Sequence, residues 1–206
     1  MLTIATALPW EASYFAKRLS HPTRIPLGDG WAVEGFRGTT SVRLVVSGPG
    51  RKSVEAVTAQ LDRIRPLTSA VLSTGVAGGL TDTLTSGTLI LDNSADKTAD
   101  PPSQNESLFD KNSRKHIEAL LQQKRIAFQK GGVLTVDKPL VNPREKHEAF
   151  VSSGALIAQM EDTAWQEWAN VVRIPFITLR VVLDEANNEL PPEVLTWNWR
   201  GPTWLQ

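Results

Sequence analysis

Apolar positions in this chain follow two spacings, one typical of buried strands and one typical of amphipathic helices. Short apolar runs predict strands at residues 2–8, 31–36, 42–46, 70–72, 88–91, 132–136, 155–158 and 176–183. Helical spacing predicts helices at residues 9–19, 51–64, 113–123, 143–150 and in a segment that begins near Glu161. Strands and helices mostly alternate, which predicts a three-layer α/β/α fold with a mixed central sheet.

Three segments lack either spacing and are predicted as turns or loops. Residues 21–30 are rich in turn formers, and residues 73–80 form a loop of small side chains. Residues 92–105 are polar and contain two adjacent prolines, so we expect a mobile loop there.

Length and composition narrow the class of protein. A chain of 206 residues suits one domain over residues 1–206. Lysine and arginine total 22, equal to aspartate and glutamate, so no basic surface for nucleic acid is expected. The chain has no cysteine, which excludes disulfides, thiolate zinc sites and a cysteine nucleophile. No metal and no cofactor are predicted, and the absence of a long apolar run favours a cytoplasmic protein.

The stretch from Gln159 to Asp184 carries the most informative chemistry. A carboxylate pair, Glu161 and Asp162, opens a predicted helix, and an apolar strand then ends at Asp184. Ligands of open α/β sheets bind at the carboxyl ends of parallel strands, so Asp184 is a candidate site residue. Arg180 lies four residues earlier and faces the same side of an extended strand. Taken singly, each carboxylate is equally typical of a solvated side chain, and Arg180 of an ion pair inside the sheet.

Four motifs occur in one order along the chain. They are Ala7-Leu8-Pro9-Trp10-Glu11, Ser47-Gly48-Pro49-Gly50-Arg51-Lys52, Thr74-Gly75-Val76-Ala77-Gly78-Gly79-Leu80, and Met160-Glu161 followed by the strand from Arg180 to Asp184. Together they resemble the purine nucleoside phosphorylase and methylthioadenosine/S-adenosylhomocysteine nucleosidase superfamily. The resemblance implies cleavage of a purine nucleoside and predicts hydrolytic release of adenine from a 5′-substituted adenosine, by a homodimer.

The resemblance also implies a part for each matched residue. Cleavage of the N-glycosidic bond passes through a ribosyl cation. The leaving base must therefore be protonated, the ribose must be bound in position and a nucleophile must attack C1′. Asp184 would protonate purine N7, and Glu161 would accept hydrogen bonds from the ribose hydroxyls. Glu11 would orient the attacking water, and Met160 would lie against the sugar. Further predicted substrate contacts are Val76, Ala77, Gly78 and Arg180.

Water and phosphate are the two nucleophiles used by this superfamily. Phosphate needs several cationic groups, and where the phosphorylases have an arginine and a loop serine this chain has Ser73 and Val76. Arg43 and Arg51 remain as possible cations. We therefore predict a hydrolase, with a phosphorylase and a catalytically silent nucleoside-binding protein as alternatives.

The sequence departs from the family pattern at two places. No aromatic residue occurs at 136–140, where the family's base-stacking ring is expected, and only 22 residues follow Asp184. Among them Leu190-Pro191-Pro192 resembles the hopanoid-associated branch, which removes adenine from adenosylhopane. Trp197, Trp199 and Trp204 would either cover the sheet or form an apolar surface for a hydrophobic 5′ group or a subunit partner.

Overall fold

The structure, a computed structural model, describes residues 1–93, 108–191 and 193. The described chain divides into two compact units. Unit 1 comprises residues 1–75 and 161–176, and unit 2 comprises the described residues of 76–160 and 177–193. The expectation of one domain over residues 1–206 stays a prediction.

Unit 1 is built on a mixed sheet with the strand order β2-β3-β4-β1-β5. Its strands are β1 (Leu2–Thr6), β2 (Ser20–Leu27), β3 (Gly30–Arg37), β4 (Thr40–Val46) and the first part of β5 (Ala70–Gly79). β1 runs parallel to both β4 and β5, whereas β2–β3 and β3–β4 are antiparallel pairs. Because β1 is central and buried, its carboxyl end presents the first motif from the middle of the sheet.

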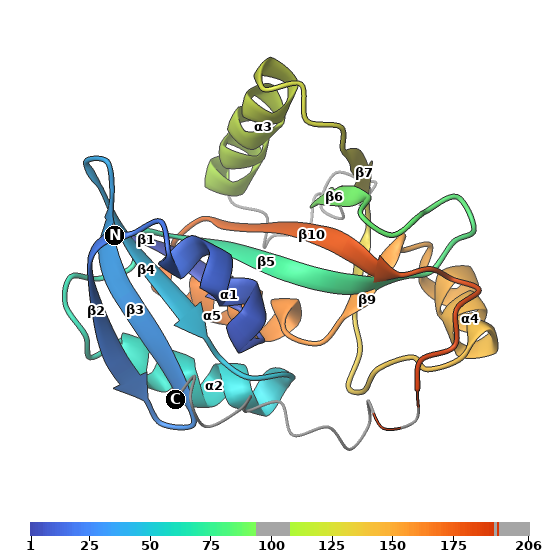
Figure 1. The fold of residues 1–206 in the computed structure, drawn as a ribbon, viewed down its shortest axis with the longest axis horizontal. Coiled ribbons are helices and arrows are strands. Elements are labelled where there is room, and N and C mark those ends of the chain that lie inside the picture. Colours follow the sequence, from blue (N-terminus) through green and yellow to red (C-terminus); the bar gives the residue numbers. More distant parts are fainter. Residues whose placement is uncertain (94–107, 192, 194–206) are drawn as a thin grey trace. The chain divides into compact units, whose positions relative to one another are not determined.

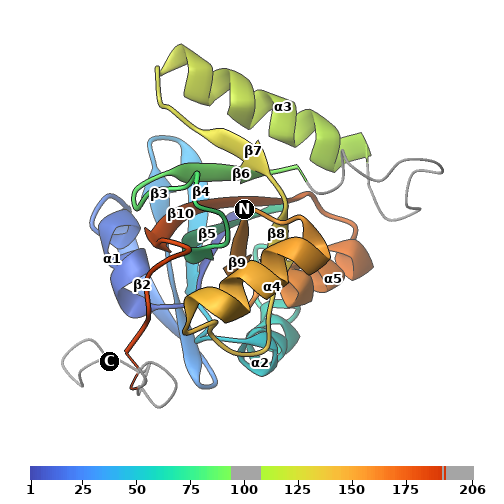
Figure 2. The ribbon, with the colours of Figure 1, turned by 90° about the vertical axis from the view of Figure 1, so that its right-hand side faces the viewer.

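The helices of unit 1 cover both faces of this sheet (Figures 1 and 2). They are α1 (Pro9–Ala16), α2 (Arg51–Leu61) and α5 (Asp162–Val172). Along β4, Leu44 and Val46 pack with α1, while Val45 packs with α2 and α5, as the strand's alternation requires. Trp165 of α5 is buried in the apolar cluster that Val45 shares with α2 and α5.

Unit 2 contains the rest of β5 and a second group of short strands. These are β6 (Leu89–Asp92), β7 (Gln129–Gly131), β8 (Val133–Thr135), β9 (Ile157–Gln159) and β10 (Phe176–Asp184), with helices α3 (Leu108–Gln123) and α4 (Pro143–Ser153). The order is β5-β10-β6-β7, and β9 joins β8 to β5. Figure 2 shows α3 running beside β6 and β7. Mixed pairing and flanking helices confirm the predicted α/β fold class.

Several predicted elements needed correction. Residues 21–30, predicted as turns, mostly form β2, an exposed edge strand bonded to β3 alone, so its sequence shows no buried alternation and tolerates two prolines. The predicted loop at 73–80 is mostly strand, because β5 continues to Gly79. Residues 94–105 of the predicted mobile loop and residues 194–206, which include the tryptophan-rich tail, lie outside the described residues. In the part that is described, no helix is long and apolar enough to cross a membrane.

Candidate active site

Glu11 is held by the backbone at the start of α1. Its Oε2 accepts hydrogen bonds from the backbone N–H of Ala7 at 3.0 Å and of Leu8 at 2.8 Å. Leu8 is the N-cap residue and has no side-chain oxygen, so Glu11 at the third helical position supplies the cap. The carboxylate is 9% exposed, which rules out the solvated side chain that a lone glutamate would suggest.

Gly75 in β5 leaves room for the carboxylate of Glu11. Its φ is +136°, and a Cβ there would lie 2.3 Å from Oε1 of Glu11. Any side chain at this position would therefore displace the carboxylate. The first and third motifs meet at this point within unit 1.

Glu161 immediately precedes α5 and is 5% exposed. Its Oε1 accepts a hydrogen bond at 2.9 Å from the backbone N–H of Gly50, the N-cap residue of α2, whose φ is +82°. The neighbouring Asp162 accepts a 2.6 Å hydrogen bond at Oδ1 from the hydroxyl of Ser73. Unit 1 thus brings the second motif against Glu161 of the fourth.

Asp184 ends β10 in unit 2 and is also 9% exposed. Its Oδ2 lies 2.6 Å from Nζ of Lys146, a residue of α4. Gly78 packs against the same group, because a Cβ at residue 78 would lie 3.3 Å from Oδ2 and 3.5 Å from Oδ1. The structure therefore joins Gly78 to Asp184 and adds Lys146 as an ion-pair partner.

Lys146 is the site residue that sequence reasoning missed. It shares a helix face with Ala149 and Phe150, which lie three and four residues later and pack in an apolar cluster of unit 2. A lysine at an apolar position of an amphipathic helix was the available signal. Alone it is weak, because lysines near the start of a helix are commonly solvated.

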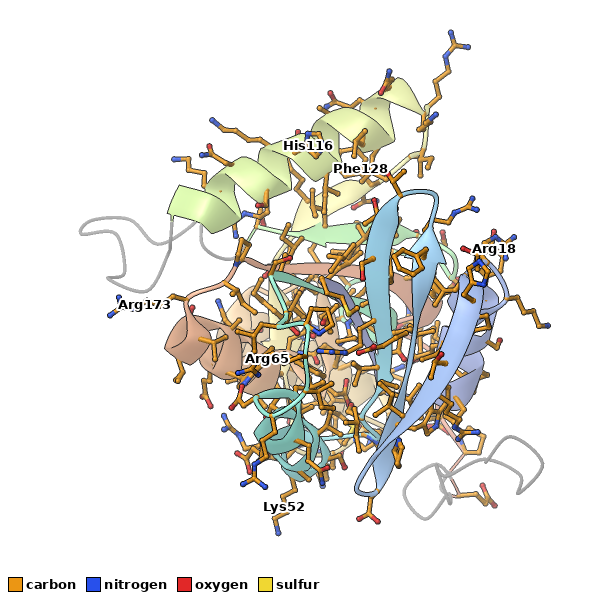
Figure 3. The ribbon with its side chains drawn as sticks, turned by 90° about the vertical axis from the view of Figure 1, so that its left-hand side faces the viewer. Arg18, Lys52, Arg65, His116, Phe128 and Arg173 are labelled. Carbon is orange, nitrogen blue, oxygen red and sulfur yellow. The ribbon has the colours of Figure 1, made fainter. Side chains whose placement is uncertain are left out.

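The other predicted contacts differ in exposure. Val76, Gly78 and Met160 are partly exposed, whereas Ala77 is buried among apolar side chains of unit 2. Arg180 in β10 is 1% exposed, consistent with the structural alternative that the sequence left open. The three histidines, His21, His116 and His147, are all exposed, and Figure 3 shows His116 on α3.

The two candidate phosphate-binding arginines of unit 1 are paired with carboxylates. Arg43 is fully buried and donates from Nε to Glu34 at 2.7 Å and from Nη2 to the carbonyl oxygen of Pro66 at 3.1 Å. Arg51 binds Glu167 with two hydrogen bonds of 2.7 and 2.8 Å, which lower the pKa of that carboxyl. Lys52 extends from α2 away from the ribbon (Figure 3).

The described residues contain no group of three or more His, Asp or Glu side chains placed to hold a metal ion. In unit 1 the candidate groups are carboxylates held by backbone N–H groups. In unit 2 they are a carboxylate and a buried lysine.

Comparisons with known proteins find the same fold in several solved structures. The S-adenosylhomocysteine nucleosidase of Streptococcus pyogenes superposes with a TM-score of 0.75 at 20% identity, over 90% of this chain and 84% of that one. The 5′-methylthioadenosine/S-adenosylhomocysteine nucleosidase of Neisseria meningitidis gives 0.76 at 18% identity, over 90% and 86%. A futalosine hydrolase of Helicobacter pylori also gives 0.76 at 18%, over 90% and 86%.

These likenesses lie below 25% identity and show a shared fold. No curated protein matches the chain significantly. The family model for the phosphorylase superfamily matches residues 2–199, which is nearly the whole length. The chain therefore belongs to the phosphorylase superfamily.

Proposed function

We propose that this protein is an N-ribosyl hydrolase that releases the base, adenine in particular, from a 5′-substituted adenosine. The observation that carries the proposal is the state of the three carboxylates Glu11, Glu161 and Asp184. Each is at most 9% exposed, and each has a specific partner: backbone N–H groups for Glu11 and Glu161, and the ammonium of Lys146 for Asp184. Buried carboxylates require such compensation, which solvated surface residues do not. The nucleosidases and the futalosine hydrolase with which the chain shares its fold support the same reaction type.

The proposed parts follow from what each group can do. Asp184 gives a proton to N7 of the leaving base, which converts a poor anionic leaving group into a neutral one. Glu161 accepts hydrogen bonds from the vicinal ribose hydroxyls, with Met160 against the sugar. Glu11 orients and polarises the attacking water. Val76 and Gly78 contact the nucleoside, while Ala77 and Arg180 support the strands that carry those contacts.

Water is the proposed nucleophile because the two candidate arginines are engaged elsewhere. Binding of phosphate to Arg51 would break its bidentate pair with Glu167, and Arg43 is held among Glu34 and backbone oxygen. The reaction should therefore proceed equally well without phosphate. A phosphorylase would instead require phosphate and form ribose 1-phosphate.

The 5′ substituent is proposed to be hydrophobic, as the hopanoid-like Leu190-Pro191-Pro192 sequence suggests. In unit 2 the backbone N–H of Leu190 donates to the carbonyl oxygen of Val141 at 2.7 Å, which anchors Leu190 beside the start of α4. We further propose a homodimer that works without metal or cofactor and on a nucleoside rather than a nucleic acid.

The test is release of adenine, followed by chromatography, from adenosine and from 5′-alkylthioadenosines of increasing chain length, with and without phosphate. The proposal expects free pentose as the second product, no response to phosphate and faster turnover with the longer alkyl groups. Base release from none of these nucleosides by folded protein would favour the silent binding protein instead. A requirement for phosphate would identify a phosphorylase.

The variant Asp184→Asn tests whether Asp184 is the general acid that protonates the base. Adenine release should fall by about a hundred- to ten-thousand-fold, the usual range for loss of a general acid. The same variant should keep most of its activity on p-nitrophenyl β-ribofuranoside, because nitrophenolate leaves without a proton. An equal loss of rate on both substrates would show that Asp184 is not the general acid.

A further inference from the structure

Lys146 is unusual for its burial. It is 0% exposed, and it is the one fully buried residue of α4. Lysine is seldom buried without a partner, because an ammonium group loses most of its hydration there. The position therefore calls for a specific explanation.

Three oxygen atoms surround the ammonium group. Nζ lies 2.6 Å from Oδ2 of Asp184 and donates to the carbonyl oxygens of Glu185 and Asn188, each at 2.8 Å. Two of the three ammonium N–H groups go to the carbonyl oxygens, and the ammonium forms an ion pair with Oδ2 of Asp184. Because Lys146 is fully buried among these groups, we expect it to act on the reaction through Asp184 and the turn that follows it.

The ion pair with Lys146 makes the two carboxylate oxygens of Asp184 different from each other. Oδ2 is buried and lies against Lys146, so Oδ1 is the oxygen that remains to meet a ligand. The two carbonyl contacts fix residues 185–188 around the same ammonium, which keeps the carboxylate from turning. Holding a reacting group in one orientation is a recognised source of rate enhancement.

We propose that Lys146 is a positioning residue that makes Asp184 an effective acid, an inference that rests on the proposed hydrolysis. As the C1′–N9 bond breaks, its electron pair passes to the base, and the proton on Oδ1 of Asp184 moves to N7. The carboxyl group thereby gains a full negative charge, shared by Oδ1 and Oδ2. The fixed positive charge of Lys146 beside Oδ2 stabilises that charge as it develops. Solvent returns the proton before the next turnover.

Other charged groups near this pair are engaged elsewhere. Glu185 accepts from the backbone N–H of Ser86 at 3.1 Å, and Glu145 accepts from that of Val141 at 2.9 Å. Arg180 lies on the same strand as Asp184, four residues earlier. Lys146 is the ion-pair partner that the described structure gives Asp184.

Lys146→Gln separates charge from anchoring, because its amide can still donate to the two carbonyl oxygens. The proposal expects adenine release to fall at least tenfold, while nitrophenol release from p-nitrophenyl β-ribofuranoside changes less than threefold. A residue that only supports the fold would lower both rates alike. Equal losses on the two substrates, or an adenine rate within twofold of the wild type, would overturn the proposal.

A double variant sharpens the result. In an Asp184→Asn background, Lys146→Gln should add no further loss of adenine release, because its effect requires the carboxyl group. A full additional loss in the double variant would contradict action through Asp184.

If Lys146→Gln does not fold, Lys146→Arg provides an alternative test of the proposal. It keeps the charge, but its longer planar head displaces Oδ2, so the ratio of adenine to nitrophenol rates should still fall. An unchanged ratio would count against a positioning function. Failure of the proposed function is distinguishable, because the wild-type protein itself would then release no base.

Discussion

Gly75→Ala tests whether the strand glycine exists to make room for Glu11. The substitution would place a methyl group 2.3 Å from Oε1 and 2.7 Å from Cδ of Glu11. The carboxylate would have to leave, and Oε2 would lose its hydrogen bonds from the N–H groups of Ala7 and Leu8. The N-terminus of α1 would then be uncapped.

The expected destabilisation follows from these contacts. Hydrogen bonds to a charged group contribute about 1.5 kcal/mol each at the lower end of their range, so the two together contribute about 3 kcal/mol. A backbone held at φ +136° adds strain for alanine of about 1–3 kcal/mol. We therefore expect the free energy of unfolding of Gly75→Ala to fall by roughly 4–6 kcal/mol.

Urea unfolding of four proteins separates the two terms. They are the wild type, Gly75→Ala, Glu11→Ala and the double variant. With the carboxylate already removed, the alanine at residue 75 should cost only the strain, so the double variant should be about 3 kcal/mol more stable than the two single changes predict by addition. Gly38→Ala is a matched control, because its φ is +61° and nothing lies within 4 Å of its Cβ position. It should cost about 1–2 kcal/mol.

Gly75 does not make room for Glu11 if Gly75→Ala lowers the free energy of unfolding no more than Gly38→Ala does. Additive effects of the Glu11 and Gly75 changes would lead to the same conclusion. The same change should also lower adenine release as strongly as Glu11→Ala does. Full activity in Gly75→Ala would show that the reaction does not need the Glu11 carboxylate in its observed position.

Two more predictions concern unit 1. Glu161→Gln should keep its hydrogen bond from Gly50 yet slow cleavage of adenosine more than that of 2′-deoxyadenosine, because an amide accepts fewer hydrogen bonds from ribose; an unchanged ratio of the two rates would contradict the part given to Glu161. Arg51 holds the pKa of Glu167 below its ordinary value of 4.5, so their pair should stabilise the fold above that pH and lose this effect as pH falls through the lowered pKa. In Arg51→Gln, an NMR titration should find the pKa of Glu167 back near 4.5, while Arg144→Gln should leave it lowered.

The sequence predicted elements well where burial imposed a spacing. The buried strands β1, β4 and β10 and the helices α2 and α4 were all expected within a few residues of their observed bounds. The elements that were missed have little burial. β2 is an exposed edge strand and β7 has only three residues, so neither shows a pattern in its own sequence. Their pairing is decided by the neighbours β3 and β6, which a single-sequence reading does not supply.

At the candidate site, the sequence predicted which carboxylate residues take part better than it predicted which groups contact them. The order of the motifs selected Glu11, Glu161 and Asp184, and burial of all three distinguishes them from solvated carboxylates. The donors that hold them could not be read in the same way. Glu11 and Glu161 are held by three backbone N–H groups, which no residue type specifies. The partner of Asp184 is Lys146, which is 38 residues away along the chain and meets it only through the fold.

The glycine motifs themselves have a physical explanation in these contacts. Each proposed carboxylate lies against a glycine of another motif: Glu11 against Gly75, Glu161 against Gly50, and Asp184 against Gly78. In the first and third cases a Cβ would crowd the carboxylate, and in the second a backbone with φ of +82° turns its N–H toward it. A glycine motif is weak alone because most glycines only mark turns. Four motifs in order are informative because they contain matched partners, so loss of a carboxylate would remove the reason for its glycine. Substitution of Gly50, Gly75 or Gly78 should therefore be tolerated better in proteins of this fold that have lost the facing carboxylate.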